Sequence, residues 1–431
     1  MPPTATTLPP EHSSHSTITV AGITLLHAFT HAFQVLLIPL YLMIQRDLNL
    51  TGASAVALIV TVYNFAYWTL SLGSGILADR FNRKVLLGIG LIGNAAAIAM
   101  MGLTRQYELL LLLGVVAGLF GTLFHPAANA LASAHYPRSP GTIIGIIGIG
   151  AGIGFFFGPR IAGWRAETHG WERPLVECGI AGVVVGTLFL LFASEVRGRK
   201  AHIRVFTSGD RVPGPAMTPA LRRRVLCAAA VLGWRDFSAF ASMTIASIYL
   251  QKAQGRSVRE TGLILGSMML VSVFVNPLCV WASPRKRRLP TLIASLILGG
   301  ALLALVPWVS PAWTLAVFAL FQTCSLCSFA LGDAAMLERV DANVRGRVVG
   351  LFLTVAGTLG SIAPWVTGWY TDHMGPAAGD QRNYVLPFAV LGSIMALAAF
   401  STPIISRFGA QDTTPEGEQQ AENLAMMAGE M

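Results

Sequence analysis

Charged residues are scarce in this chain of 431 residues, which carries 30 basic and 21 acidic side chains, or 12% of the total. A soluble protein carries about 25%. The mean hydropathy of +0.61 and the hydrophobic content of 54% point the same way. The composition excludes a large soluble enzyme and predicts a protein that crosses a membrane several times.

Cysteine is also rare, and all five cysteines fall inside apolar runs. Cys324 and Cys327 would share one helix rather than a redox-active turn, so we expect no disulfide and no metal. The chain also lacks the sequence signatures of nucleotide hydrolysis, zinc hydrolases and serine hydrolases. We therefore expect no enzyme activity and no cofactor, and any uphill transport must draw on an ion gradient or on exchange.

Twelve apolar runs are long enough to cross a bilayer, which takes about 20 residues as a helix. The runs lack the ten-residue alternation of barrel strands, so we predict an all-α membrane protein with twelve transmembrane helices. The expected spans are 18–44, 53–77, 83–104, 107–134, 141–166, 173–194, 223–251, 257–281, 289–309, 312–337, 345–371 and 384–406.

The polar segments outside these spans set the topology. We expect a disordered N-terminal tail at 1–17, which lacks the basic start of a secretory signal, a linker at 195–222 and an acidic tail at 407–431. Loops on the side of the termini carry 20 Lys and Arg against eight on the other side, which predicts cytoplasmic termini in a plasma (inner) membrane. The net charge of +9 is spread over these loops, so we expect membrane lipids as its partner and no nucleic acid.

The chain also contains an internal repeat. Pro159, Gly163 and Trp164 recur as Pro364, Gly368 and Trp369 at a constant offset of 205. In the same frame the basic loop at 78–84 falls beside a second basic loop at 282–288. Two six-helix bundles at 18–194 and 223–406 are therefore expected to be parallel repeats.

Two motifs resemble those of the major facilitator superfamily. Residues 75–84 read GILADRFNRK, which resembles the loop signature GxxxDRxGR(R/K), with Asn82 where the family has Gly. Residues 154–163 are similar to the fifth-helix exporter motif GxxxGPxxGG and match it at most positions. The resemblance implies two bundles that rock about a central site to give alternating access, usually in a monomer.

Three local features resemble the fosmidomycin-resistance group of drug exporters within that superfamily. They are His27-Ala28-Phe29, His125-Pro126-Ala127 and Arg235-Asp236-Phe237. That group commonly has an acid four residues after the first His, where this chain has His31. The fourth span also lacks the Arg of the drug/proton antiporter motif.

The superfamily motifs suggest moving parts. The resemblance implies that the loop residues latch the two bundles in the outward-open state, although these charges could simply set the topology. The glycines and prolines of spans five and eleven suggest a hinge or tight helix packing. The latch residues are Gly75, Asp79, Arg80, Arg83 and Lys84, and Asp79 could also cap the third span; the hinge residues are Gly154, Gly158, Pro159, Gly163, Pro364 and Gly368.

Ionisable side chains inside spans are functional candidates because burying them in the bilayer is costly. Arg235 lies near the midplane and could attract an anionic substrate group or pair with a carboxylate from another helix. Asp236 points about 100° away on a helix, so we expect no simple pair between these two neighbours.

The three candidate histidines fall on two spans. His27, His31 and Gln34 share one face of the first span, where they could bind substrate, carry protons near pH 6.5 or bond between helices. His125 and Asp333 occupy comparable late positions in the two repeats, toward the cytoplasm. They suggest an inner gate, a proton site or an interhelical hydrogen bond.

One further charge lies in the outer third of span five. Arg160 could reach the membrane interface or line an outer cavity.

We predict a secondary active transporter, and among such transporters a proton-coupled exporter of a small organic compound or drug. One alternative is uptake or exchange of an organic anion, and another is a non-transporting membrane sensor or scaffold. A lipid-modifying enzyme would need a cluster of histidines or carboxylates, and His27, His125 and Asp333 are dispersed in the sequence.

Overall fold

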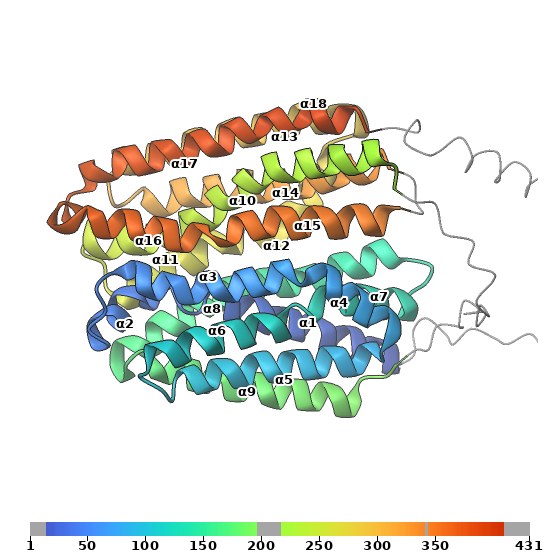
Figure 1. Cartoon of the computed structure of the whole chain (residues 1–431), viewed down its shortest axis with the longest axis horizontal. Coiled ribbons are helices and arrows are strands. Elements are labelled where there is room, and N and C mark those ends of the chain that lie inside the picture. Colours follow the sequence, from blue (N-terminus) through green and yellow to red (C-terminus); the bar gives the residue numbers. More distant parts are fainter. Residues whose placement is uncertain (1–13, 196–216, 341–343, 409–431) are drawn as a thin grey trace, which may run out of the picture.

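The structure, a computed structural model, describes residues 14–195, 217–340 and 344–408. These residues form helices and no strands, as expected for an all-α protein (Figure 1). In the N-terminal half the helices are α1 (Ser14–Val35), η1 (Ile38–Leu40), α2 (Tyr41–Asp47), α3 (Ala53–Thr69), α4 (Ser71–Arg80), α5 (Arg83–Met101), α6 (Tyr107–Gly121), α7 (Phe124–His135), α8 (Pro140–His169) and α9 (Glu172–Phe192).

The C-terminal half follows the same plan. Its helices are α10 (Pro219–Lys252), α11 (Val258–Leu270), α12 (Ser272–Ala282), η2 (Arg285–Arg287), α13 (Arg288–Leu305), η3 (Val306–Trp308), α14 (Thr314–Leu337), α15 (Arg345–Ser361), α16 (Ala363–His373), η4 (Gly375–Gly379), η5 (Gln381–Tyr384), α17 (Val385–Leu397), η6 (Ala398–Phe400) and α18 (Ser401–Ser406).

Ten helices of the described chain are long and apolar enough to cross a membrane, or eleven if the bent pair α3 and α4 counts as one span. The predicted twelve are therefore not fully reproduced. The expected span 257–281 is broken at Val271 into α11 and α12, each too short to cross alone. α3 and α4 meet at an angle of 48°.

Two predicted boundaries were wrong by one helical turn. Residues 14–17 begin α1 instead of ending a disordered tail, because Ser16 bonds to His135 and the His15 carbonyl accepts from Thr19. Residues 219–222 begin α10 instead of ending the linker. There the Thr218 hydroxyl caps the helix by accepting from the Leu221 amide at 3.1 Å, and Pro219 suits the first turn. The rest of both segments and the tail after Phe408 lie outside the described residues.

The two halves lie side by side with their helices roughly along one direction (Figure 1). α4, α7 and α18 lie at one end of the molecule, which we call the terminal end, and α2 lies at the other, which we call the α2 end.

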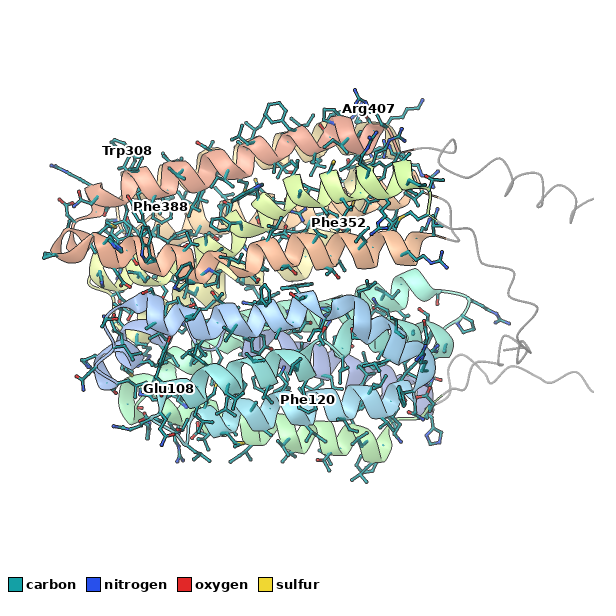
Figure 2. All side chains as sticks on the ribbon, viewed as in Figure 1. Glu108, Phe120, Trp308, Phe352, Phe388 and Arg407 are labelled. Atoms are coloured by element: carbon teal, nitrogen blue, oxygen red, sulfur yellow. The ribbon has the colours of Figure 1, made fainter. Side chains whose placement is uncertain are left out.

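Apolar side chains cover the outside of the bundle. Trp281, Leu103 and Trp308 are 82%, 76% and 70% exposed, and Trp308 points away from the helices in Figure 2. Exposing so much apolar surface to water would be unfavourable, whereas contact with lipid chains is not. The protein is therefore a multi-pass membrane protein in contact with lipid.

Candidate functional site

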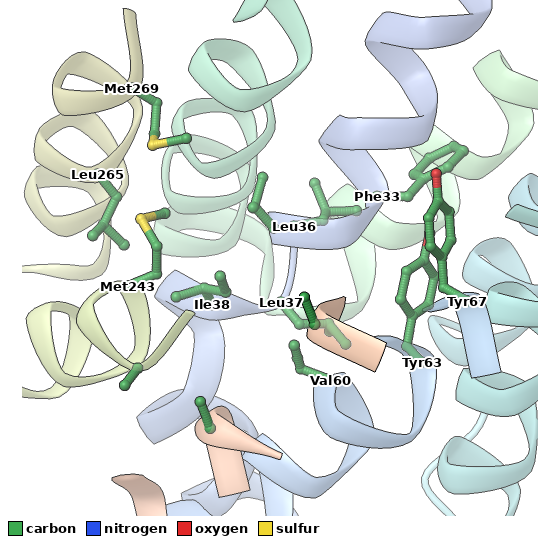
Figure 3. Packing of buried hydrophobic residues seen from close by; sticks show 14 of the residues in the cluster. Phe33, Leu36, Leu37, Ile38, Val60, Tyr63, Tyr67, Met243, Leu265 and Met269 are labelled. Carbon is green, nitrogen blue, oxygen red and sulfur yellow. The ribbon is translucent and has the colours of Figure 1, made fainter. Parts of the chain in front are cut away.

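A cavity of about 280 Å³ lies between the two halves. Most of its wall is apolar, and Met243 and Met269 line it beside Ile38 and Val60 (Figure 3). Both halves contribute, because α1, α3 and α8 meet α10, α11, α14, α15 and α16 there. The polar side chains on its wall are His31, Gln34, Asn64, Arg235, Asp236, Thr244, Gln322 and Asp333.

The C-terminal half supplies a charged corner of this cavity. The Arg235 side chain is fully buried, and its Nε donates to Asp236 Oδ1 at 2.8 Å while a terminal nitrogen lies 2.7 Å from the same oxygen. The guanidinium also donates to the Ser328 carbonyl at 3.1 Å and stacks 3.7 Å from the centre of the Phe329 ring. Asp333 lines the same cavity.

The expectation that Arg235 and Asp236 do not pair was wrong. The helical wheel gives the directions of the two Cβ atoms, but the long Arg side chain folds back to its neighbour. A buried guanidinium needs a counter-charge, and the neighbouring Asp236 carboxylate supplies it.

The N-terminal half brings three histidines together. His31 Nε2 lies 3.0 Å from His27 Nε2. The His125 ring centre lies 5.2 Å from that of His27 and 5.5 Å from that of His31. The view of His27 and His125 as dispersed was therefore wrong, because α1 and α7 pack against each other. Asp333 is not part of this cluster.

Hydrogen bonds orient two of these rings. His27 Nδ1 lies 2.8 Å from the Ile147 carbonyl of α8, and His31 Nδ1 lies 2.6 Å from Gln34 Oε1. Phe124 stacks on His27 with the ring centres 4.6 Å apart, and Phe155 packs against His31. Of the three predicted residues on this face of α1, His31 and Gln34 reach the cavity wall.

Arg160 lies away from the central cavity. It is exposed, its guanidinium lies 5.6 Å from the centre of the Phe156 ring, and it lines a shallow surface pocket with Trp164 and Arg259. Its exposed side chain reaches outward from α8, which fits the predicted position toward the membrane interface.

The charged loop that resembles the superfamily motif lies at the terminal end. Asp79 and Arg80 are exposed, Arg83 Nε donates to the Ala78 carbonyl at 3.4 Å, and the Lys84 amide donates to Glu195 at 2.8 Å. The suggested cap by Asp79 was wrong, because the Asn82 side chain caps α5 by accepting from the Val85 amide. Asn82 stands where the motif usually has Gly.

The predicted repeat is visible in bond geometry. Arg288 Nε donates to the Ser283 carbonyl at 3.2 Å, just as Arg83 Nε donates to the Ala78 carbonyl in the other half. Each residue of the first pair corresponds to one of the second at the offset of 205. Arg285 and Arg288 also pair with Glu338 of the same half.

The glycines predicted to form a hinge lie at close helix contacts. A Cβ at Gly154 would overlap the Ala28 carbonyl, and one at Gly158 would lie 2.9 Å from the Ala32 carbonyl. α8 continues through Pro159 as one helix, and Pro364 lies in the first turn of α16, which suits a residue without an amide hydrogen.

Two of the predicted hinge glycines, Gly163 and Gly368, lie in matched contacts between the halves, which we call the seams. α8 packs on α11 in one seam, and α16 packs on α3 in the other. A Cβ on Gly163 or on Gly368 would lie against the start of the opposing helix. The residues contacted in one seam have numbers 205 higher than those contacted in the other. The matched contacts are Gly163 with Arg259 and Gly262, and Gly368 with Ser54 and Ala57.

Asp372 is a functional candidate that was not among the predicted site residues. Its two carboxylate oxygens accept from the Ala53 and Ser54 amides at 2.7 and 2.9 Å, so an acid of one half caps α3 of the other. The repeat offset of 205 could have indicated Asp372, because it pairs this residue with Glu167. A carboxylate oxygen of Glu167 lies 3.9 Å from the Arg259 guanidinium across the other seam.

Substitution of Gly154 tests how tightly α1 and α8 pack. The change to Ala should lower the free energy of unfolding by about 1–3 kcal/mol, because its Cβ would overlap the backbone of α1. Gly148→Ala in the same helix is the control, since no other side chain or helix lies within 4 Å of the place its Cβ would take, and it should be neutral or slightly stabilising. Equal effects of the two changes in detergent unfolding would contradict this account.

Comparison with known proteins agrees with this architecture. A family model described as the Major Facilitator Superfamily matches residues 21–364. "Multidrug resistance protein MdtG" of Dickeya zeae is 28% identical over 73% of this chain and 76% of that protein. The "Hexuronate transporter" of Bacillus subtilis is 24% identical over 84% and 89%.

A solved structure shares the fold. A bacterial homologue of the human lysosomal transporter Spinster superposes with a TM-score of 0.76 at 18% identity, covering 94% of this chain and 99% of that one. The motif at 75–84, the repeated halves, the central cavity and the family match lead to one conclusion. The chain belongs to the Major Facilitator Superfamily and is built as a transporter, not as an enzyme.

Proposed function

We propose that this protein is a proton-coupled exporter of small, largely apolar organic compounds. The observation that carries the proposal is the cavity between the halves, whose apolar wall has ionisable groups from both halves. His31 faces it from the N-terminal half, and Arg235, Asp236 and Asp333 face it from the C-terminal half. An apolar wall with few polar groups suits an uncharged or weakly polar drug, and the similarity to a multidrug resistance protein favours export.

We further propose that the halves rock to expose the cavity to each side in turn. Three bonds between the halves support a state closed at the α2 end: Asp372 to α3, Ser247 Oγ to the Ile38 carbonyl at 2.7 Å, and Gln251 to the Pro39 carbonyl at 3.1 Å. Among the described residues, Asp79, Arg80 and Arg83 form no hydrogen bond or ion pair with the C-terminal half. The proposed latch is then released in this state and engages when the α2 end opens, with the Pro and Gly residues of α8 and α16 as the hinge.

The charge distribution supports a cytoplasmic terminal end in a bacterial inner membrane, with the more basic loops facing the cytoplasm. In that orientation the cavity takes its compound from the cytoplasm or the inner leaflet. One chain contains both halves of the cavity, which supports a working monomer.

Proton coupling predicts a specific loss in Asp333→Asn. Asparagine keeps the shape of the side chain but exchanges no proton, so compound-driven proton flux should fall at least about tenfold while exchange of labelled compound persists. The test uses proteoliposomes with an internal pH dye, hydrophobic drugs and small organic anions as compounds, and His169→Gln as an exposed control. Full proton flux in Asp333→Asn would show that this acid carries no coupled proton.

A second candidate function is uptake or exchange of an organic anion. Arg235 on the cavity wall favours it, as does the similarity to a hexuronate transporter, whose named compound is a sugar carboxylate. Counterflow of a carboxylate without proton movement in the same vesicles would favour this function over proton-coupled export.

A further inference from the structure

The three clustered histidines present a set of metal ligands. His27 and His31 come from α1 and His125 from α7, and one ring nitrogen of each lies within 4.8 Å of the others. The ring nitrogens of His27 and His31 that face one another are 3.0 Å apart. Neutral imidazole is a common ligand of zinc and related ions.

The hydrogen bonds behind the rings show what those facing nitrogens carry. A carbonyl oxygen only accepts, so His27 Nδ1 donates its hydrogen to Ile147, and His31 Nδ1 donates to Gln34 Oε1. In neutral rings, Nε2 of each then presents a lone pair to the other. Two lone pairs at 3.0 Å repel, and a cation held by both relieves that repulsion.

We propose that His27, His31 and His125 bind one divalent transition-metal ion of the Zn²⁺ class. Three imidazoles with a free fourth position are a known zinc arrangement, and bonds of 2.0–2.1 Å put tetrahedral ligands about 3.3 Å apart. The His27 to His31 separation is close to that value, and the His125 nitrogen, which lies within 4.8 Å of the other two, would move closer to complete the set. An all-imidazole set favours zinc, copper, nickel or cobalt over magnesium or calcium.

The surroundings fit such a site. The carbonyls of Ile147 and Gln34 fix the rings from behind, as second partners of metal-bound histidines do. Phe124 and Phe155 cover two of the rings, and His31 reaches the central cavity, which gives the fourth position access to water or a compound. No metal was expected from the sequence, because that expectation rested on the cysteines and these histidines lie apart along the chain.

Metal binding to the purified full chain tests the proposal without any transport measurement. The protein should carry an affinity tag free of histidine, be stripped with a chelator in detergent, and be titrated with Zn²⁺ against a chelating dye. We expect one Zn²⁺ per chain. His27→Gln and His31→Gln should each weaken binding at least about 100-fold, and Gln34→Leu about 10–100-fold through lost ring orientation.

Two controls separate the site from general effects. His135→Gln removes a buried histidine outside the cluster, bonded instead to Ser16 and Ser194, and should leave binding unchanged. His125→Cys replaces one ligand by another and should retain the ion, with a thiolate absorption band when Co²⁺ is used. That band also shows that the variant is folded.

Two results would overturn the proposal. One is wild-type Zn²⁺ binding no tighter than that of the His27→Gln, His31→Gln double variant, as expected if the two rings share only a proton. The other is a loss of Zn²⁺ binding in the His135→Gln control as large as that in His27→Gln, because the ion would then not depend on the three-histidine cluster. Neither result depends on whether the protein exports drugs.

Discussion

Arg235→Met should lower the transport rate at least about 100-fold and lower the free energy of unfolding by about 3–5 kcal/mol. The stability loss follows because Asp236 is 5% exposed and would lose the guanidinium that neutralises it. The transport loss follows because the same guanidinium forms the charged corner of the cavity. Unfolding in mixed micelles measures the first effect, and vesicle uptake or efflux measures the second.

A double variant separates these two effects. Arg235→Met with Asp236→Asn removes both charges while keeping the volumes similar, so it should recover stability to within about 1 kcal/mol of wild type. Transport should stay lost. Recovery of transport together with stability would mean that the pair only holds the helix in place. An unchanged stability in Arg235→Met would show that Asp236 needs no counter-charge.

Asp372→Ala should open the α2 end. The carboxylate accepts two backbone amides at the positive start of α3, and this clasp should contribute about 2 kcal/mol to the closed state. Losing it should shift the ratio of closed to open molecules by about 30-fold, since 1.4 kcal/mol corresponds to tenfold. Pulsed EPR between spin labels at Thr51 and Gly379, in a chain with its five cysteines replaced by alanine, would show the longer distance directly.

The matched control is Asp380→Ala at the same end of the molecule. Asp380 caps η5 by accepting from the Arg382 amide at 2.9 Å, so its bond stays within one half. It should leave the label distance unchanged. If both variants give the wild-type distance, Asp372 does not hold the two halves together.

Much of the fold could be predicted because the bilayer imposes a simple rule. Each of the twelve apolar runs corresponds to a helix or to consecutive helices, with starts that differ by a few residues. The internal breaks could not be predicted in this way. Val271 and Leu70 each lie inside a predicted span, and neither has a Pro or a charged residue beside it to mark a break.

The site was harder to predict because it depends on how helices rotate about their axes. The i to i+4 spacing did place His27 and His31 together, and their facing ring nitrogens lie 3.0 Å apart. Nothing along the chain places His125 beside them, since that contact joins α1 to α7 across about 100 residues. Asp372 was passed over because an acid near the end of a span resembles an ordinary loop residue.

The two seams have a consequence for how the molecule is held together. Gly163 meets residues 259 and 262, while Gly368 meets residues 54 and 57, so each half offers the other an equivalent surface. In an isologous twofold dimer each subunit uses the same patch to contact the other, and here the two halves of one chain do the same. A patch that matches itself can also match a second copy. Separately expressed halves should therefore find each other, and two copies of one half should compete for the same surface.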